Sequence, residues 1–267
     1  MPINHPGEPT GNRFREDLTR VEPRALRTFT PTQAVIARSA GIYHWLADGR
    51  RLYDFTSGVL VSNLGHNPTS WMERFSRYMG WSDFKLGNTA DTPFFPALPM
   101  TAYNAATTVE IDATRRLLAC LRKCSGGARM EQVMWAASGS EAIQKGLWAA
   151  MARDRTRTMI LATRFGFHGK KGLANAVTGS ETDAERDPRV RFISFPTAEC
   201  RDVSLRDEPF DPSPYQRELD VLLHQYGRKI GTLITEPYLG GGGSYHPPKV
   251  YLQLLERFCR DNDIVFI

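Results

Sequence analysis

Short apolar runs alternate with amphipathic segments over the second half of the chain. The apolar runs predict buried strands at residues 132–136, 158–162, 190–195, 230–236 and 264–267. The segments with apolar residues at helical spacing predict helices at residues 109–121, 141–153, 215–226 and 250–262. Strands and helices in alternation predict a parallel sheet covered by helices, which binds its ligands at the carboxyl ends of the strands.

The N-terminal part of the chain has a different pattern. Residues 1–30 carry several prolines among charged residues, which predicts an extended arm rather than a packed element. Two aromatic runs, at residues 41–45 and 51–55, flank an Asp-Gly step and predict a β-hairpin. Residues 80–105 are rich in proline, glycine and aromatic residues, and we expect irregular structure there.

A corner of small residues, Ser138, Gly139 and Ser140, opens the helix predicted from Glu141. The first N–H groups of a helix lack intrahelical partners and lie at the positive end of the helix dipole, so this corner can bind an anion. Gly139 allows close approach, and the serine hydroxyls can donate hydrogen bonds to phosphate oxygens. The local pattern by itself favours a simple helix cap, with Ser138 as N-cap and Glu141 completing a capping box.

Composition narrows the class of protein. The chain has 267 residues, of which 41% are hydrophobic and 24% charged, as in an ordinary globular protein with ample material for a core. The net charge of +5 comes from scattered arginines rather than a basic block, which argues against a nucleic-acid or membrane surface. No apolar run approaches a membrane span and no apolar leader begins the chain, so we expect a cytoplasmic protein.

Neither a disulfide framework nor a metal site is indicated by the sequence. The four cysteines are few and irregularly spaced, which favours reduced thiols. Cys120 and Cys124 lie one helical turn apart, and we expect buried thiols there because no second ligand pair has zinc spacing. We interpret His66 as a loop or core histidine, since nothing nearby in the sequence supplies a metal or nucleophile partner.

Five motifs occur in a fixed order along the chain. They are Asp54–Gly58, Leu64–Pro68, Ala137–Ala142, Phe167–Gly169 and Glu236–Gly243. In order and spacing these motifs resemble the class III (subgroup II) pyridoxal-phosphate aminotransferases, over about residues 25–267. The resemblance implies a PLP-dependent transferase of fold type I. This is an α/β fold with a mixed, mostly parallel sheet that has helices on both faces.

The resemblance also implies a domain organisation. Residues 1–30 would be an N-terminal arm, residues 31–75 the N-terminal part of the small domain with its hairpin, and residues 76–267 the cofactor-binding large domain. The large domain would be incomplete at its C-terminus. The apolar run at residues 264–267 looks like the start of a buried strand, and we therefore expect the N-terminal portion of a longer protein.

Six residues of the motifs are implied to bind the cofactor. They are Ser138, Gly139, Ser140, Phe167, His168 and Glu236. By resemblance the first three hold the phosphate, Phe167 stacks on the ring, and Glu236 supports the ring substituents. Two positions depart from the family: Ala137 replaces the usual Asn, and Gly241 replaces a Glu of ornithine- and GABA-type members. The second departure argues against those substrates.

The catalytic groups of the family are not among these motifs. Its Schiff-base Lys and the Asp that pairs with the ring nitrogen would follow Ile267, and the lysines of this chain do not match the Schiff-base position. We therefore expect no catalytic residue within this chain and no transaminase activity from it alone.

The complete protein is expected to transfer an amino group from an amine or amino acid to a 2-oxo acid, as a homodimer or larger homo-oligomer. An aminomutase, racemase or decarboxylase on this fold would share every motif, and a non-catalytic truncated subunit is the remaining alternative. Nucleotide binding is disfavoured, because Gly240–Gly243 lacks both Gly-Lys-Ser/Thr and the dinucleotide fingerprint.

Overall fold

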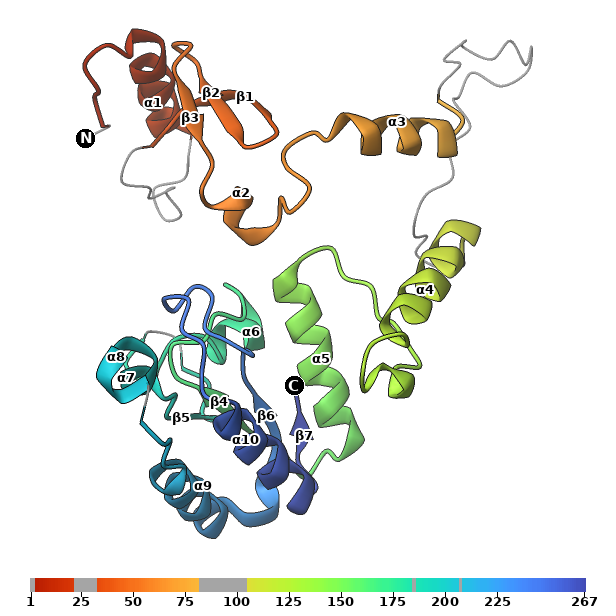
Figure 1. Ribbon diagram of the computed structural model, residues 1–267, viewed down its shortest axis with the longest axis vertical. Helices are drawn as coiled ribbons and strands as arrows, with labels where there is room; N and C mark the ends of the chain where they lie inside the picture. Colours follow the sequence, from red (N-terminus) through yellow and green to blue (C-terminus); the bar gives the residue numbers. More distant parts are fainter. Residues whose placement is uncertain (1–2, 22–32, 82–104, 184–185, 207) are drawn as a thin grey trace. The chain divides into compact units, whose positions relative to one another are not determined.

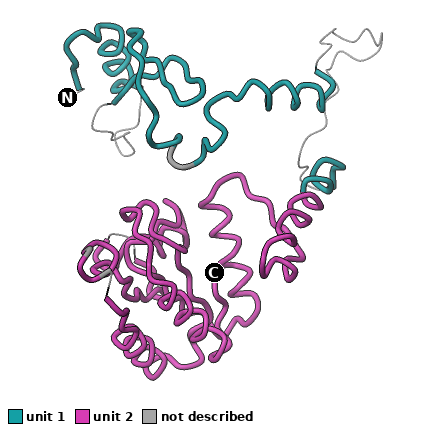
Figure 2. The backbone as a smooth tube through the Cα atoms, viewed as in Figure 1, with its two compact units in different colours: residues 1–113 teal, residues 114–267 magenta. Residues whose placement is uncertain are grey.

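The computed structural model describes residues 3–21, 33–81, 105–183, 186–206 and 208–267 (Figure 1). Its contacts divide the chain into two compact units, residues 1–113 and 114–267 (Figure 2). The domain boundaries expected at residues 30 and 75 stay predictions. Most of the stretch expected to be irregular, residues 80–105, lies outside the described residues.

In the first unit, helix α1 (Pro9–Val21) occupies part of the expected extended arm, so that prediction is wrong for these residues. Proline is tolerated at the start of a helix, where its missing N–H would have had no intrahelical partner. The Asp48 carboxylate accepts the Gly11 N–H at 2.7 Å, and the buried Arg15 guanidinium donates to Glu8 at 3.0 Å. The Asp48 contact joins the helix to the hairpin turn, which the sequence pattern of residues 1–30 could not show.

The hairpin prediction is confirmed. Strands β2 (Tyr43–Leu46) and β3 (Arg51–Tyr53) pair antiparallel, and β1 (Ile36–Ala40), which was not predicted, adds a third antiparallel strand beside β2. His66 lies outside the named helices and strands, as expected of a loop histidine, and its Nε2 lies 2.7 Å from Asp54 Oδ2. The partner comes from a residue distant in sequence, which a search of near neighbours could not find.

Three further helices follow the hairpin: α2 (Ser57–Leu60), α3 (Thr69–Tyr78) and α4 (Thr108–Leu121). The prediction of a helix at residues 109–121 is confirmed. The expected burial of Cys120 and Cys124 is wrong, since both thiols are exposed and free. Helix α4 buries only Leu118, so helical apolar spacing did not by itself identify a covered face.

A parallel four-stranded sheet of order β5-β4-β6-β7 organises the second unit. Its strands are β4 (Met159–Thr163), β5 (Val190–Ile193), β6 (Ile230–Ile234) and β7 (Val265–Phe266). Each lies within one residue of a predicted strand at its N-terminal end. The expected parallel α/β sheet is confirmed.

The apolar run at residues 132–136 forms no strand in the described part of the second unit, which corrects that prediction. Its polar groups are bound by helix side chains instead of a neighbouring strand. The Trp135 indole N–H donates to Thr114 Oγ1 at 2.9 Å, and its carbonyl accepts from Lys145 Nζ at 2.5 Å. The apolar pattern of such a short run does not by itself decide whether the run forms a strand.

Helices cover both faces of the sheet (Figure 1). They are α5 (Gly139–Arg153), α6 (Gly172–Ala176), α7 (Thr197–Arg201), α8 (Val203–Arg206), α9 (Ser213–Tyr226) and α10 (Lys249–Asp261). Side chains alternate along a strand, so Ile160 packs with α5 and α6 whereas Leu161 packs with α9 and α10. The chain therefore has the predicted α/β architecture, with a separate core on each face of the sheet.

Candidate functional site

The turn that begins α5 is a helix cap of the predicted kind. Ser138 has extended backbone angles, and its Oγ accepts the Glu141 N–H at 3.2 Å. The Glu141 carboxylate in turn accepts the Ala137 N–H at 2.7 Å. The Ser138 side chain is thereby used to order the turn, and Glu141 fixes the approach of the preceding chain.

The backbone N–H groups of Gly139 and Ser140 take no part in this cap. Within the part of the chain that the structure describes, the amides of Gly139 and Ser140 have no hydrogen-bond partner. A Cβ placed on Gly139 would meet no atom within 4 Å, so the space beside the turn is open. Two donors at the positive end of a 15-residue helix, next to open space, suit a phosphate or another oxyanion.

The loop that follows β4 lies directly against this turn. The Lys170 N–H donates to Ser140 Oγ at 3.2 Å, which uses the serine hydroxyl to join the two segments. Gly169 has φ +141°, and a Cβ there would lie 2.3 Å from Ser140 Oγ. Only glycine allows this approach, because any side chain would displace the Ser140 hydroxyl.

His168 supports the same loop from inside. It is buried, and its backbone N–H donates to Thr178 Oγ1 at 2.8 Å, while the Thr178 hydroxyl donates to the Ala174 carbonyl. Burial lowers the pKa of His168 and outweighs the opposite effect of the Glu236 carboxylate. The imidazole is therefore neutral at pH 7, and its ring lies close to Gly166.

Glu236 connects the loop after β4 with the loop after β6. One carboxylate oxygen accepts the Phe167 N–H at 2.8 Å, and the other accepts the Gly240 N–H at 3.1 Å. The Phe167 side chain remains 51% exposed, so its aromatic face is available to a ligand. A Cβ on Gly241 would lie 3.4 Å from Phe167 Cβ, so these two residues are neighbours.

The structure thus places the turn that carries Ser138, Gly139 and Ser140 against the loop of Phe167 and His168 after β4, and Glu236 joins that loop to the loop after β6. Their roles in binding stay predictions. The six predicted cofactor-binding residues did not include Thr178, Lys170 and Gly240, which also take part in these contacts. Thr178 lies in the Val-Thr-Gly segment that follows the Phe-His-Gly motif, which was a usable signal. The other two contribute backbone N–H groups, for which side-chain identity gives no signal.

The donor set fits a cofactor that has an anionic group and a flat ring. Free backbone amides suit the anion, and the exposed face of Phe167 suits an apolar or aromatic ring. Among the helices described, none has both the length and the apolar character needed to cross a lipid bilayer.

One family model and several known proteins match this chain. The family model for "Aminotransferase class-III" matches residues 96–267. The chain is 24% identical over 240 residues to a probable 4-aminobutyrate aminotransferase of Bacillus subtilis, covering 88% of this chain and 50% of that protein. It is 28% identical over 243 residues to an acetylornithine aminotransferase of Xanthomonas campestris, covering 91% of this chain and 52% of that protein. The chain spans about half the length of the curated relatives it matches.

Solved structures show the same fold. An amine transaminase from an uncultivated Pseudomonas species, in its PLP-bound form, matches with a TM-score of 0.71 and 24% identity, over 91% of this chain and 54% of that chain. A β-phenylalanine aminotransferase from Variovorax paradoxus matches with a TM-score of 0.70 and 19% identity, over 97% of this chain and 51% of that chain.

Proposed function

Because the chain belongs to the class III aminotransferases, we propose that its α5 turn and the two adjoining loops form the phosphate-binding and ring-stacking part of a pyridoxal 5'-phosphate site. The observation that carries this proposal is the pair of unpartnered Gly139 and Ser140 amides, within the described chain, beside the open space at Gly139. Pyridoxal phosphate supplies a protonated ring that withdraws electrons from a bound amine.

The backbone and side-chain groups of this site then have distinct roles. The Gly139 and Ser140 amides bind the phosphate, and Ser138 keeps the turn in shape through its bond to Glu141. Phe167 offers its face to the ring. Glu236 sets the position of that face by holding the Phe167 N–H, and neutral His168 supports the loop from below.

We propose that the whole protein transfers an amino group from an amine or amino acid to a 2-oxo acid. The family and the names of the relatives support this reaction class. Gly241 lies beside Phe167 and leaves space where ornithine- and GABA-type members carry a glutamate, so we expect a donor other than those two. An aminomutase, racemase or decarboxylase would use the same phosphate turn, and product analysis distinguishes them.

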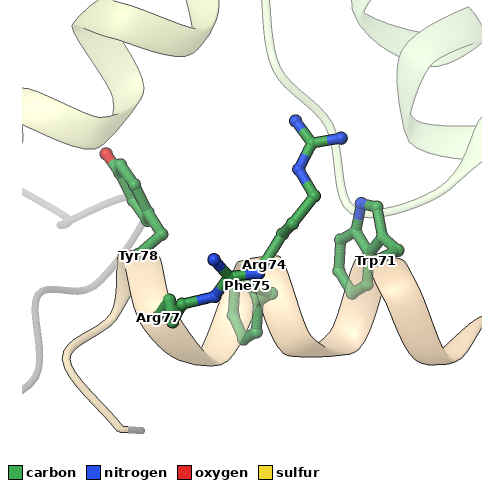
Figure 3. A pocket seen from close by; sticks show the side chains of 5 residues that line it. All are labelled: Trp71, Arg74, Phe75, Arg77 and Tyr78. Atoms are coloured by element: carbon green, nitrogen blue, oxygen red, sulfur yellow. The ribbon is translucent and has the colours of Figure 1, made fainter.

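We further propose that the protein acts in the cytoplasm as a homodimer or larger homo-oligomer. Exposed apolar side chains of the first unit support self-association. On α3 the rings of Trp71 and Phe75 stack at 5.2 Å, and Figure 3 shows them lining a hollow with Arg74, Arg77 and Tyr78. Trp71 and Tyr78 are 47% and 62% exposed.

The lysines of this chain do not match the Schiff-base position of the family, so we propose that the 267 residues alone do not transaminate. The chain is mixed with pyridoxal phosphate, reduced with borohydride and digested for mass spectrometry. We expect no lysine to be modified stoichiometrically. A single fully modified lysine, together with turnover of an amino donor, would overturn this proposal.

A further inference from the structure

Two histidines and one carboxylate converge in the first unit. Asp54 Oδ2 lies 2.7 Å from His66 Nε2 and 3.4 Å from His44 Nε2. One ligand atom from each of the three residues lies within 4.8 Å of the other two. The imidazole rings are 4.5 Å apart between centroids. Ligand atoms of a tetrahedral zinc ion lie about 3.3 Å apart, so the His44–Asp54 pair already has this spacing, and the hydrogen-bonded His66–Asp54 pair would have to open by about 0.6 Å.

The backbone of each histidine is held by hydrogen bonds. His44 lies on β2, which is paired with a strand on both sides. His66 forms an antiparallel bridge with Gly41, through N–H to carbonyl bonds of 2.8 and 2.9 Å. His44 and His66, which are 22 residues apart in the chain, therefore present their rings from fixed positions.

The carboxylate is ordered as well. Asp54 Oδ1 accepts from the N–H and the hydroxyl of Thr56, and Oδ2 accepts the Gly58 N–H at 2.8 Å. The Asp54 backbone N–H donates to the Ile42 carbonyl at 2.8 Å. The Asp54 side chain is 3% exposed, and the two imidazoles are 16% and 17% exposed. An ion could therefore reach Oδ2 from the side of the rings.

The far nitrogen of each ring faces a serine. Ser39 Oγ lies 2.7 Å from His44 Nδ1, and Ser62 Oγ lies 3.4 Å from His66 Nδ1. When Nδ1–H donates to the serine, the Nε2 lone pair of that ring points at the Asp54 carboxylate. In that tautomer a cation is attracted by both lone pairs and by the anionic oxygen, whereas without a cation the His66 Nε2–H donates to Asp54 Oδ2. Metal-binding histidines are oriented in this way by an outer hydrogen bond.

We propose that His44, Asp54 and His66 bind a divalent transition-metal ion, with zinc as the preferred metal. Two imidazole nitrogens and one carboxylate oxygen are a known zinc ligand set, with water as the fourth ligand. The ion connects the hairpin to the segment that carries His66 and stabilises the first unit. This proposal departs from the expectation of no metal site, and it does not depend on the proposed aminotransferase function.

The direct test follows the imidazole nitrogens of the wild-type chain by ¹⁵N NMR during titration with zinc chloride after chelator treatment. We expect the Nε2 signals of His44 and His66 to move together and saturate at one equivalent, while the exposed His224 does not respond. Because this measurement uses the wild-type chain, it does not depend on any variant folding. Absence of a saturable change at His44 and His66 would overturn the proposal.

Variants test the ligand assignment. His44→Gln and His66→Gln keep an N–H that can donate to Asp54 but remove the ligand nitrogen. Each should weaken zinc affinity roughly tenfold or more, and should abolish the rise in melting temperature that zinc gives the wild type. His224→Gln is the matched control and should keep both. Equal zinc affinity in all three variants would place the metal elsewhere and contradict the site.

Discussion

The carboxylate of Glu236 accepts the backbone N–H of Phe167 at 2.8 Å, across 69 residues of sequence. Its second oxygen accepts the Gly240 N–H at 3.1 Å, so one side chain fixes both the loop after β4 and the loop after β6. A carboxylate can accept at both oxygens without a competing donor, whereas a Gln amide has only one acceptor oxygen.

Glu236→Gln should destabilise the chain by about 1–2 kcal/mol, because the amide has only one acceptor oxygen and its NH₂ group would face a backbone N–H. The free energy of unfolding in urea measures this. Glu256→Gln is the control, since Glu256 pairs with Arg260 on the exposed surface of α10 and should change stability by less than about 0.5 kcal/mol. Equal effects of the two variants would contradict the bridging role.

Gly169→Ala should displace the loop from the α5 turn, because the new Cβ would lie 2.3 Å from Ser140 Oγ. We expect a loss of roughly 1–3 kcal/mol in unfolding free energy. Gly126→Ala separates the clash from backbone strain, since Gly126 has φ +77° with no atom within 4 Å of its Cβ position. Gly169→Ala should be the more damaging of the two, and the reverse order would argue against close contact with Ser140.

Arg157 should be a major stabilising residue of the second unit. Its buried guanidinium donates to the carbonyl of Ile230, at the start of β6, and to those of Asn262 and Asp263, between α10 and β7. Arg157→Met should cost about 2–4 kcal/mol in urea unfolding, because these carbonyls lose a charged donor. Arg153→Met removes only an exposed ion pair and should cost about 1 kcal/mol or less. If Arg157→Met lowers the free energy of unfolding no more than Arg153→Met does, the carbonyls have found other partners.

The thiols should differ in reactivity at pH 8. Burial raises the pKa of the Cys259 thiol to about 12, so it stays protonated and unreactive, whereas Cys120 and Cys124 are exposed. Mass spectrometry after iodoacetamide treatment should find the exposed pair alkylated in the native chain, and Cys259 alkylated only in urea. Alkylation of native Cys259 as fast as Cys120 would contradict its burial.

The raised pKa of Cys259 also makes the free energy of unfolding depend on pH. A thiol whose pKa is raised by folding contributes its full stability below the ordinary thiol pKa of about 8.5 and loses it as the pH rises toward 12. The free energy of unfolding should therefore fall between about pH 9 and 11, and Cys259→Ala should reduce that dependence. An identical slope in the variant would show that other groups cause it.

The sequence predicted the second unit far better than the first. Strands β4 and β6 are short, buried apolar runs between amphipathic helices, and local pattern is informative when a segment is buried on both faces. Helix α1 depends instead on polar contacts such as Arg15 with Glu8 and the Asp48 cap. No hydrophobic periodicity encodes such contacts.

The candidate site shows the same division. Order and spacing of motifs selected the α5 turn, Phe167 and Glu236 as candidates, but did not show the contacts between their segments. The contact between Lys170 and Ser140 uses a backbone N–H, and the His44–Asp54–His66 cluster is assembled by strand pairing. Both depend on tertiary geometry that residue identity does not specify.

The Gly139 and Ser140 amides are proposed to bind the phosphate of pyridoxal phosphate. Pyridoxamine 5'-phosphate is the cleanest probe, because it keeps the phosphate but has no aldehyde to react with surface lysines. Its binding to the 267-residue chain is measured by equilibrium dialysis beside pyridoxamine, which lacks the phosphate. Gly139→Pro is the test variant, since proline at this first helical position removes the N–H without breaking the helix.

The wild-type chain should bind one equivalent of the phosphorylated probe and should bind pyridoxamine at least about tenfold more weakly, which corresponds to the loss of a charge-assisted hydrogen-bond set. Gly139→Pro should lower the affinity for the phosphorylated probe and leave the weak binding of pyridoxamine unchanged. Equal affinity for the two probes, or full phosphate-dependent binding in Gly139→Pro, would contradict the account.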